Sequence, residues 1–191
     1  MKIFNQFINS ISAIGKTAGF DAGFIFPYSS DKVEKRDQIW KNLKQGILLE
    51  DKNMLVPWLL PFGKLDIIKE NRIDSGDRTN WYLGKRTILD GYEAHIEVMK
   101  WKFVPLNKPI KRISENLGRD EQGMKKFTFL KGHITGLLGD PTKSSVGKIG
   151  AFDTGEISWE RGSVSISLVG IEHFDFRYTL NIGFIFTNSI Y

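Results

Sequence analysis

The strongest constraint on the fold is an unbroken two-residue alternation near the carboxyl end of the chain. Polar and apolar side chains alternate there for about ten residues, whereas a typical strand has about five or six. The apolar positions are Phe174, Phe176, Tyr178, Leu180, Ile182 and Phe184, and the polar positions are His173, Asp175, Arg177, Thr179 and Asn181. Because successive side chains of a strand point to opposite faces, this segment predicts a strand with one buried face.

The segment before it repeats the pattern with serines. Val164, Ile166 and Leu168 are expected to face the core, which leaves three serines on the other side. If the two strands pair, hydroxyls and ionisable groups share one exposed face, and this face is our candidate partner-binding surface. Its predicted residues are Ser163, Ser165, Ser167, His173, Asp175, Arg177 and Thr179.

A hydrolase triad on this face is disfavoured, although serine, histidine and aspartate are all present. His173 and Asp175 share one strand, and no strained nucleophile turn or oxyanion hole is recognisable nearby. We therefore predict no catalytic residues on this surface.

Helix and turn signals divide the rest of the chain. Asp31 and Glu34 form a capping-box pattern that predicts a helix over 31–45. The Asp90-Gly91 pair between alternating runs predicts a hairpin within 80–104. A third helix is expected over about 121–138, ended by Gly139. The apolar spacing near the amino terminus predicts an amphipathic helix over about 3–14, and 62–69 is long enough for a short one.

These elements predict an α+β fold in a single domain over 1–191. We expect an antiparallel sheet of two meanders, each of about three strands, packed against three or four helices. Since helix, glycine, proline and strands recur in that order, an alternative is a duplicated helix-plus-meander unit with half-repeats 31–104 and 121–187.

Composition narrows the functional classes. The 191 residues include no cysteine, which excludes disulfides, thiolate catalysis and zinc sites built on sulfur, and which suits a reducing cytosol. Polar residues interrupt every apolar run near the amino terminus, so an export signal is not expected, nor is any run long enough to span a membrane. We predict a cytoplasmic protein that does not act on a membrane.

The middle of the chain is basic, with 11 lysines and arginines against four acidic residues over 100–148. Basic and aromatic residues interleave there, as single-stranded nucleic acid requires. The candidate anion-binding residues are Lys100, Lys102, Lys111, Arg112, Lys125 and Lys126. Trp101 and Phe103 share a strand face opposite the first two lysines, so we expect the aromatic face to be buried beneath a charged one.

Two further motifs fail on inspection. The loop 139–148 resembles a phosphate-binding loop, but Thr142 and Ile149 stand where that motif needs glycine and a hydroxyl residue, and the loop follows a helix instead of preceding one. Glu93, His95 and Glu97 share a strand face, yet side chains two residues apart on a strand diverge, so a solvated surface is expected. We predict no metal and no cofactor.

Residues 127–169 carry one family resemblance. A helix closing with Leu-Gly-x-Pro-Thr is followed by a tryptophan-bearing strand that begins EISWERG. This arrangement resembles small uncharacterised bacterial proteins of the toxin-immunity type, and the resemblance implies direct contact with a cognate toxin domain and no catalytic residues. The leading hypothesis is therefore a non-enzymatic protein-binding protein. The alternatives are a nucleic-acid-binding module over 100–131 and a small-ligand enzyme with a cleft between the two halves.

Overall fold

The computed structural model describes residues 23–172 and 174–184. The predicted helix at 3–14 and the side chain of His173 lie outside these residues. The helices are α2 (Lys32–Gln45), η1 (Glu50–Lys52), η2 (Phe62–Ile67) and α3 (Asp120–Leu138). The strands are β1 (Gly46–Leu49), β2 (Met54–Pro57), β3 (Asn71–Ser75), β4 (Arg78–Ile88), β5 (Tyr92–Trp101), β6 (Arg112–Arg119), β7 (Lys143–Ser144), β8 (Gly147–Ile149), β9 (Phe152–Arg161), β10 (Val164–Glu172) and β11 (Phe176–Phe184).

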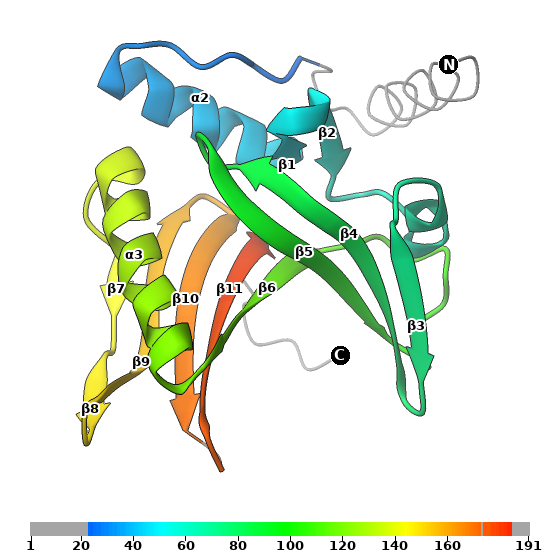
Figure 1. The fold of residues 1–191 in the computed structure, drawn as a ribbon. Coiled ribbons are helices and arrows are strands. Elements are labelled where there is room, and N and C mark those ends of the chain that lie inside the picture. The colour runs from blue at the N-terminus through cyan, green and yellow to red at the C-terminus, as the bar shows by residue number, and fades with distance from the viewer. Residues whose placement is uncertain (1–22, 173, 185–191) are drawn as a thin grey trace.

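One antiparallel sheet of nine strands dominates the molecule, in the order β3-β4-β5-β6-β11-β10-β9-β7, with β8 paired to β9. The predicted architecture, two meanders of about three strands packed on three or four helices, is wrong. The described residues contain two α-helices and two short 3-10 helices beside this single large sheet (Figure 1). The single-domain extent and the half-repeats 31–104 and 121–187 remain predictions.

The sequence signals for α2 and for the hairpin are confirmed. Asp31 caps α2, because its Oδ1 accepts a hydrogen bond from the backbone N–H of Glu34 at 2.8 Å. Leu89, Asp90 and Gly91 turn between β4 and β5 with positive φ angles. The Glu50 carboxylate accepts the N–H groups of Asp90 at 2.7 Å and Gly91 at 2.9 Å, which ties this turn to η1.

The predicted alternation of the two C-terminal strands is confirmed within β10 and β11, but Phe174, which was expected on the buried face, precedes β11 and is 92% exposed. Tyr178, Leu180 and Ile182 of β11 are buried, whereas Arg177 before them is exposed and Thr179 and Asn181 between them are half-buried. On β10 the inward positions Val164, Ile166 and Leu168 are fully buried. The register pairs β10 with β11 from Val164↔Phe184 to Glu172↔Phe176. Both strands therefore direct the same apolar face into the core.

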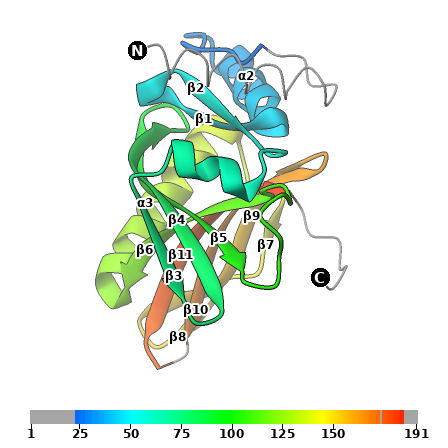
Figure 2. The same cartoon turned by 90° about the vertical axis from the view of Figure 1, so that its right-hand side faces the viewer.

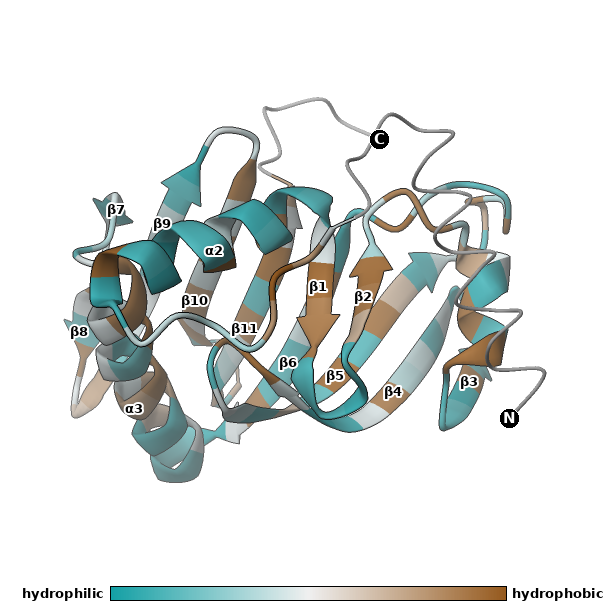
Figure 3. Ribbon diagram, turned by 90° about the horizontal axis from the view of Figure 1, so that it is seen from above, coloured by the Kyte–Doolittle hydropathy of each residue, from teal (hydrophilic) through white to brown (hydrophobic). Residues whose placement is uncertain are grey.

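All of the described helices lie on one side of the sheet. Helix α3 packs against β6, β11, β10 and β9, while α2 contacts α3 and the β1–β2 hairpin. Seen from above in Figure 3, α2 and the β1–β2 hairpin lie over the sheet, and Figure 2 shows β3–β5 standing in front of β9–β11. Two buried indoles fix this layer: Trp58 Nε1 donates to the Leu43 carbonyl at 2.6 Å and Trp159 Nε1 to the Gly139 carbonyl at 2.9 Å.

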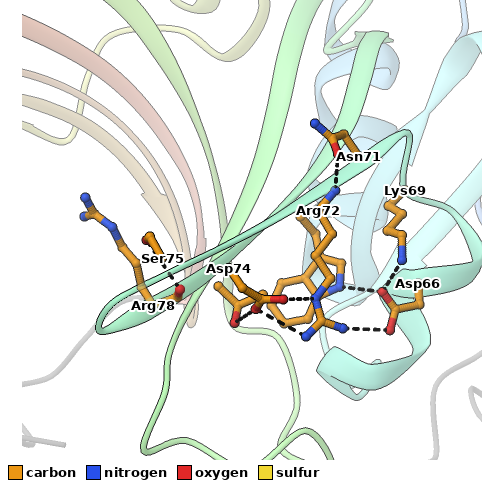
Figure 4. A network of polar contacts seen from close by, with 9 residues as sticks. Asp66, Lys69, Asn71, Arg72, Asp74, Ser75 and Arg78 are labelled. Atoms are coloured by element: carbon orange, nitrogen blue, oxygen red, sulfur yellow. Dashed lines mark hydrogen bonds and ion pairs between the residues drawn. The ribbon is translucent and has the colours of Figure 1, made fainter.

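The edge strand β3 is fastened to the rest of the molecule by an ionic network (Figure 4). Arg72 donates to Asp74 at 3.1 Å and to Asp66 at 3.3 Å, and its guanidinium carbon lies 5.2 Å from the ring centroid of Trp81. Asp66 also accepts from Lys69 at 2.5 Å and from Trp81 Nε1 at 3.1 Å. This network joins β3, β4 and η2 on the helix-bearing side of the sheet.

None of the described helices is long and apolar enough to cross a membrane.

Candidate functional site

The side of the sheet away from the helices carries a polar row that crosses eight strands. Residues directly opposite each other in an antiparallel ladder point to the same face. From β3 to β7 the register aligns Asn71, Tyr82, Glu97, Ser114, Asn181, Ser167, Ser158 and Lys143, each paired with the next. The helix-free face of the sheet therefore presents hydroxyls, amides and charges from one edge to the other, and we call it the polar face.

The polar face is hollowed over β9, β10 and β11. A hollow of about 450 Å³ lies there, with Ser165, Ser167, Asn181 and Arg112 among its lining residues. Although no described helix packs on this face, Ser158 is only 3% and Ser167 only 8% exposed. The serine side chains thus form the floor of the hollow.

The charges in the hollow are balanced. Lys143 Nζ lies 2.9 Å from Glu160 Oε1, and Ser158 Oγ donates to the same oxygen at 3.3 Å. Arg112 and Glu156 also line the hollow, so two basic and two acidic residues face it. Such a surface offers donors and acceptors to a partner without strongly attracting either a cation or an anion.

The structure brings part of the predicted partner-binding set together. Ser165 and Ser167 line the hollow, and Ser163 lies in the turn between β9 and β10. Thr179 is half-buried on β11, where it pairs with Val169 and lies two residues before Asn181 in the sequence.

Asp175 and Arg177 stand apart from this group. Arg177 pairs with Ile171, whereas Ser165 pairs with Gly183, so the two ends of the predicted surface are separated by about 20 Å of strand. Asp175 Oδ1 accepts from Arg177 Nε at 2.6 Å, and Arg119 lies 2.8 Å from its other oxygen. These hydrogen bonds and charges hold the pKa of Asp175 below its usual range. Asp175 therefore pairs with both Arg177 and Arg119 at the start of β11, away from the hollow.

Ser114 and Lys143 belong to the polar face but were missed in the sequence, because β6 and β7 were not recognised as strands. Ser158 lies on β9, which was recognised as a strand, but it was not included in the predicted surface. In β6, Ile113 and Leu117 alternate with polar residues, but a glutamate occupies the inward position between them. Glu115 is buried because it accepts from Tyr92 Oη at 2.7 Å and from the His95 N–H at 3.2 Å. The alternation of Ile113 and Leu117 was the available signal.

The predicted anion-binding residues lie in separate parts of the structure. Lys100 is buried, and its Nζ donates to the carbonyls of Trp101 at 3.0 Å and Val104 at 2.8 Å. Lys102 and Lys111 are exposed in the loop between β5 and β6, and Arg112 is exposed at the start of β6, where it lines the hollow. Lys125 and Lys126 lie on α3, on the opposite side of the sheet.

The expectation that Trp101 and Phe103 are buried is wrong. Trp101 is 41% exposed and Phe103 78% exposed. The inward face of β5 is instead Ala94, Ile96, Val98 and Lys100, which places Met99 and Trp101 on the polar face. The face that β5 buries is set by its middle residues, which pack under the helix layer.

Glu93, His95 and Glu97 do not converge on a ligand. Glu93 pairs with Lys85 at 2.8 Å, and Glu97 accepts from Ser114 Oγ at 3.4 Å. Burial raises the pKa of the Glu97 carboxyl. Within residues 23–172 and 174–184, no group of three or more histidine, aspartate or glutamate side chains is arranged to hold a metal ion.

Comparison with family models, with curated proteins and with solved structures finds no match to this chain, so its function is argued from its geometry.

Proposed function

We propose that this chain is a non-enzymatic binding protein that holds a protein partner on the polar face. The observation that carries the proposal is the polar row from Asn71 to Lys143, which ends in the serine-floored hollow on the side of the sheet without described helices. An interface of this kind is specified by hydrogen bonds and charge pairs laid out over several strands.

The chemistry of the hollow favours recognition over catalysis. Its serines face an amide and paired charges, and Glu160 is already engaged by Lys143 and Ser158. A nucleophile needs a base within hydrogen-bond reach, and no histidine is among the residues that line the hollow. A broad polar surface with balanced charge fits a protein surface of mixed donors and acceptors.

A cognate toxin domain is the partner that we propose. Support comes from the resemblance of residues 127–169 to small bacterial immunity proteins, a segment that contains all five serines lining the hollow, Ser165 and Ser167 among them. We place this activity in the cytoplasm, since a chain without cysteine suits a reducing compartment.

The experiment is a binding titration of the purified chain with the purified protein products of the genes adjacent to its own. Ser165→Arg and Ser167→Arg each place a long cation in the hollow and should weaken a complex at least tenfold. Thr128→Arg is the matched control, because Thr128 is exposed on α3 on the opposite side of the sheet. Circular dichroism confirms that each variant is folded.

Equal affinities for the hollow variants and Thr128→Arg would remove the polar face from the interface. Failure of every adjacent gene product to bind would overturn the toxin-partner proposal. Turnover of a small substrate by the purified chain would overturn its non-enzymatic part.

A further inference from the structure

A stacked pair of aromatic rings is exposed where β5 ends. The ring centroids of Trp101 and Phe103 lie 6.4 Å apart with an interplanar angle of 7°. The chain has five tryptophans, and Trp40, Trp58, Trp81 and Trp159 are each 5% exposed or less. All five tryptophans lie within the described residues, and Trp101 alone among them is more than 5% exposed, beside a phenylalanine that is more exposed still.

The backbone that carries these rings is held firmly. The Lys100 ammonium is buried and donates to the carbonyls of Trp101 and Val104. The Val104 N–H donates back to the Trp101 carbonyl at 3.0 Å, and the Lys102 N–H donates to the Asp77 carbonyl at 2.8 Å. Both rings therefore project from a fixed turn, so a ligand that stacks on them meets a preorganised surface.

The surroundings of the rings are basic. Residues 98–114 contain no aspartate or glutamate and include Lys102, Lys108 and Lys111, all exposed. No carboxylate of the described residues lies within ion-pair distance of these three lysines. Asp74, whose pKa Lys102 helps to lower, is already engaged by Thr79 and Arg72. A polyanion would find positive charge here that the protein has not neutralised.

Arg78 adds a cation on the same face as the rings. It is the direct cross-strand partner of Trp101, and such partners project to the same side of a sheet. Figure 4 shows its guanidinium pointing away from the network of Asp66, Arg72 and Asp74.

We propose that Trp101 and Phe103, with Arg78 and the basic loop 102–111, form a binding site for single-stranded nucleic acid. The bases stack on the two rings and the phosphates contact Arg78, Lys102 and Lys108. The inference goes beyond the protein-binding role and uses side chains outside the hollow. We favour nucleic acid over a protein ligand, because each nucleotide of an oligonucleotide carries both a negative charge for the basic residues and a flat ring for stacking.

The test uses the full chain and the fluorescence of Trp101. The probe is an oligothymidylate of about 12 nucleotides, a length within the usual site sizes for single strands, and it is compared with an abasic oligonucleotide of equal length. We expect the oligothymidylate to quench the emission that iodide also quenches. Its affinity should fall steeply between about 50 and 200 mM salt, and the abasic strand should bind at least tenfold more weakly.

Substitutions separate stacking from charge. Trp101→Leu and Phe103→Ala each remove an exposed ring, so both variants should still fold. Each should weaken oligothymidylate binding about tenfold. The affinity is measured by the fluorescence anisotropy of a labelled strand. The double variant Lys102→Ala/Lys108→Ala should lower the salt dependence. Lys125→Ala/Lys126→Ala makes the same charge change on α3 and should bind as the unmodified chain does.

Four results would overturn the proposal. The first is absence of binding at about 50 mM salt, the second is equal affinity for the thymidylate and abasic strands, and the third is unchanged binding by Trp101→Leu. Quenching by polyglutamate but not by oligothymidylate would show an acidic protein ligand and would equally overturn it. Because Ser167→Arg lies outside this site, its effect on a protein complex tests the protein-binding role separately.

Discussion

Gly123 of α3 lies directly against Gly118 of β6. A Cβ atom on Gly123 would come within 2.5 Å of the Gly118 carbonyl oxygen and 2.6 Å of Tyr178 Cδ2. The first turn of α3 can approach the sheet this closely because Gly123 has no side chain. The contact helps to fix the distance between the helix layer and β6.

Gly123→Ala should therefore destabilise the protein by about 2–3 kcal/mol, as overpacking against backbone does. Gly132→Ala is the matched control in the same helix, because a Cβ there meets nothing within 4 Å. It should add about 0.5–1 kcal/mol through helix propensity. Urea unfolding followed by circular dichroism measures both, and two variants of equal stability would contradict the close contact.

Removing the hydroxyl of Tyr92 should destabilise the protein, because the buried Glu115 carboxylate would lose a hydrogen-bond donor. Tyr92→Phe takes one donor from a carboxylate that is only 1% exposed, leaving the His95 N–H. We expect a loss of about 2 kcal/mol. Tyr82→Phe serves as the comparison, because the Tyr82 hydroxyl accepts only a long bond of 3.4 Å from Asn80 Nδ2 on the polar face. Its unfolding free energy should change by less than about 0.5 kcal/mol.

The stabilising contribution of ionised Asp66 should be lost in acid. Hydrogen bonds from Lys69 and Trp81 and the nearby Arg72 charge lower the pKa of Asp66 below its ordinary value of 3.8. Folding then favours the ionised form, so this stabilisation is complete above that value and is lost as the pH falls through the lowered pKa. Asp66→Asn should flatten the decrease in unfolding free energy below about pH 4, measured by urea titrations at successive pH values.

Glu97 provides a control of opposite sign for that series. Burial raises the pKa of Glu97 above its ordinary value of 4.5, so folding favours its protonated form. Its stabilisation is complete below that value and is lost as the pH rises through the raised pKa. Glu97→Gln should lose less stability than the unmodified chain from about pH 4.5 towards neutrality. Identical pH profiles for Asp66→Asn and Glu97→Gln would contradict both assignments.

Local signals in the sequence were sufficient for several elements. A cap such as Asp31 and a turn such as Asp90-Gly91 act within a few residues, so their chemistry is visible without the fold. The alternation from Phe176 to Phe184 is equally explicit, because the buried face of β11 contains only apolar side chains. Two serines of the hollow, Ser165 and Ser167, were predicted for the same reason.

The remainder depends on contacts between distant segments. Strand β6 was missed because Glu115 occupies an inward position that only Tyr92 and the His95 backbone make acceptable. The exposure of Trp101 was misjudged because its neighbours along the chain do not reveal which face of β5 the helix layer covers. Lys143 joins the polar face only through pairing with Ser158, which no local pattern shows.

The junction between β5 and β6 has a consequence for the shape of the polar face. These strands are matched through a single residue pair, Glu97 with Ser114, whereas β4 and β5 are paired along nearly their whole length. Backbone hydrogen bonds therefore do little to set the tilt of one half of the sheet against the other. On the opposite side, Glu115 of β6 accepts hydrogen bonds from Tyr92 and the His95 N–H of β5, and Ile96 and Ile113 are buried in the core, so side chains there contribute to that tilt. Evolution can reshape the surface a ligand meets by exchanging side chains that the ligand never touches.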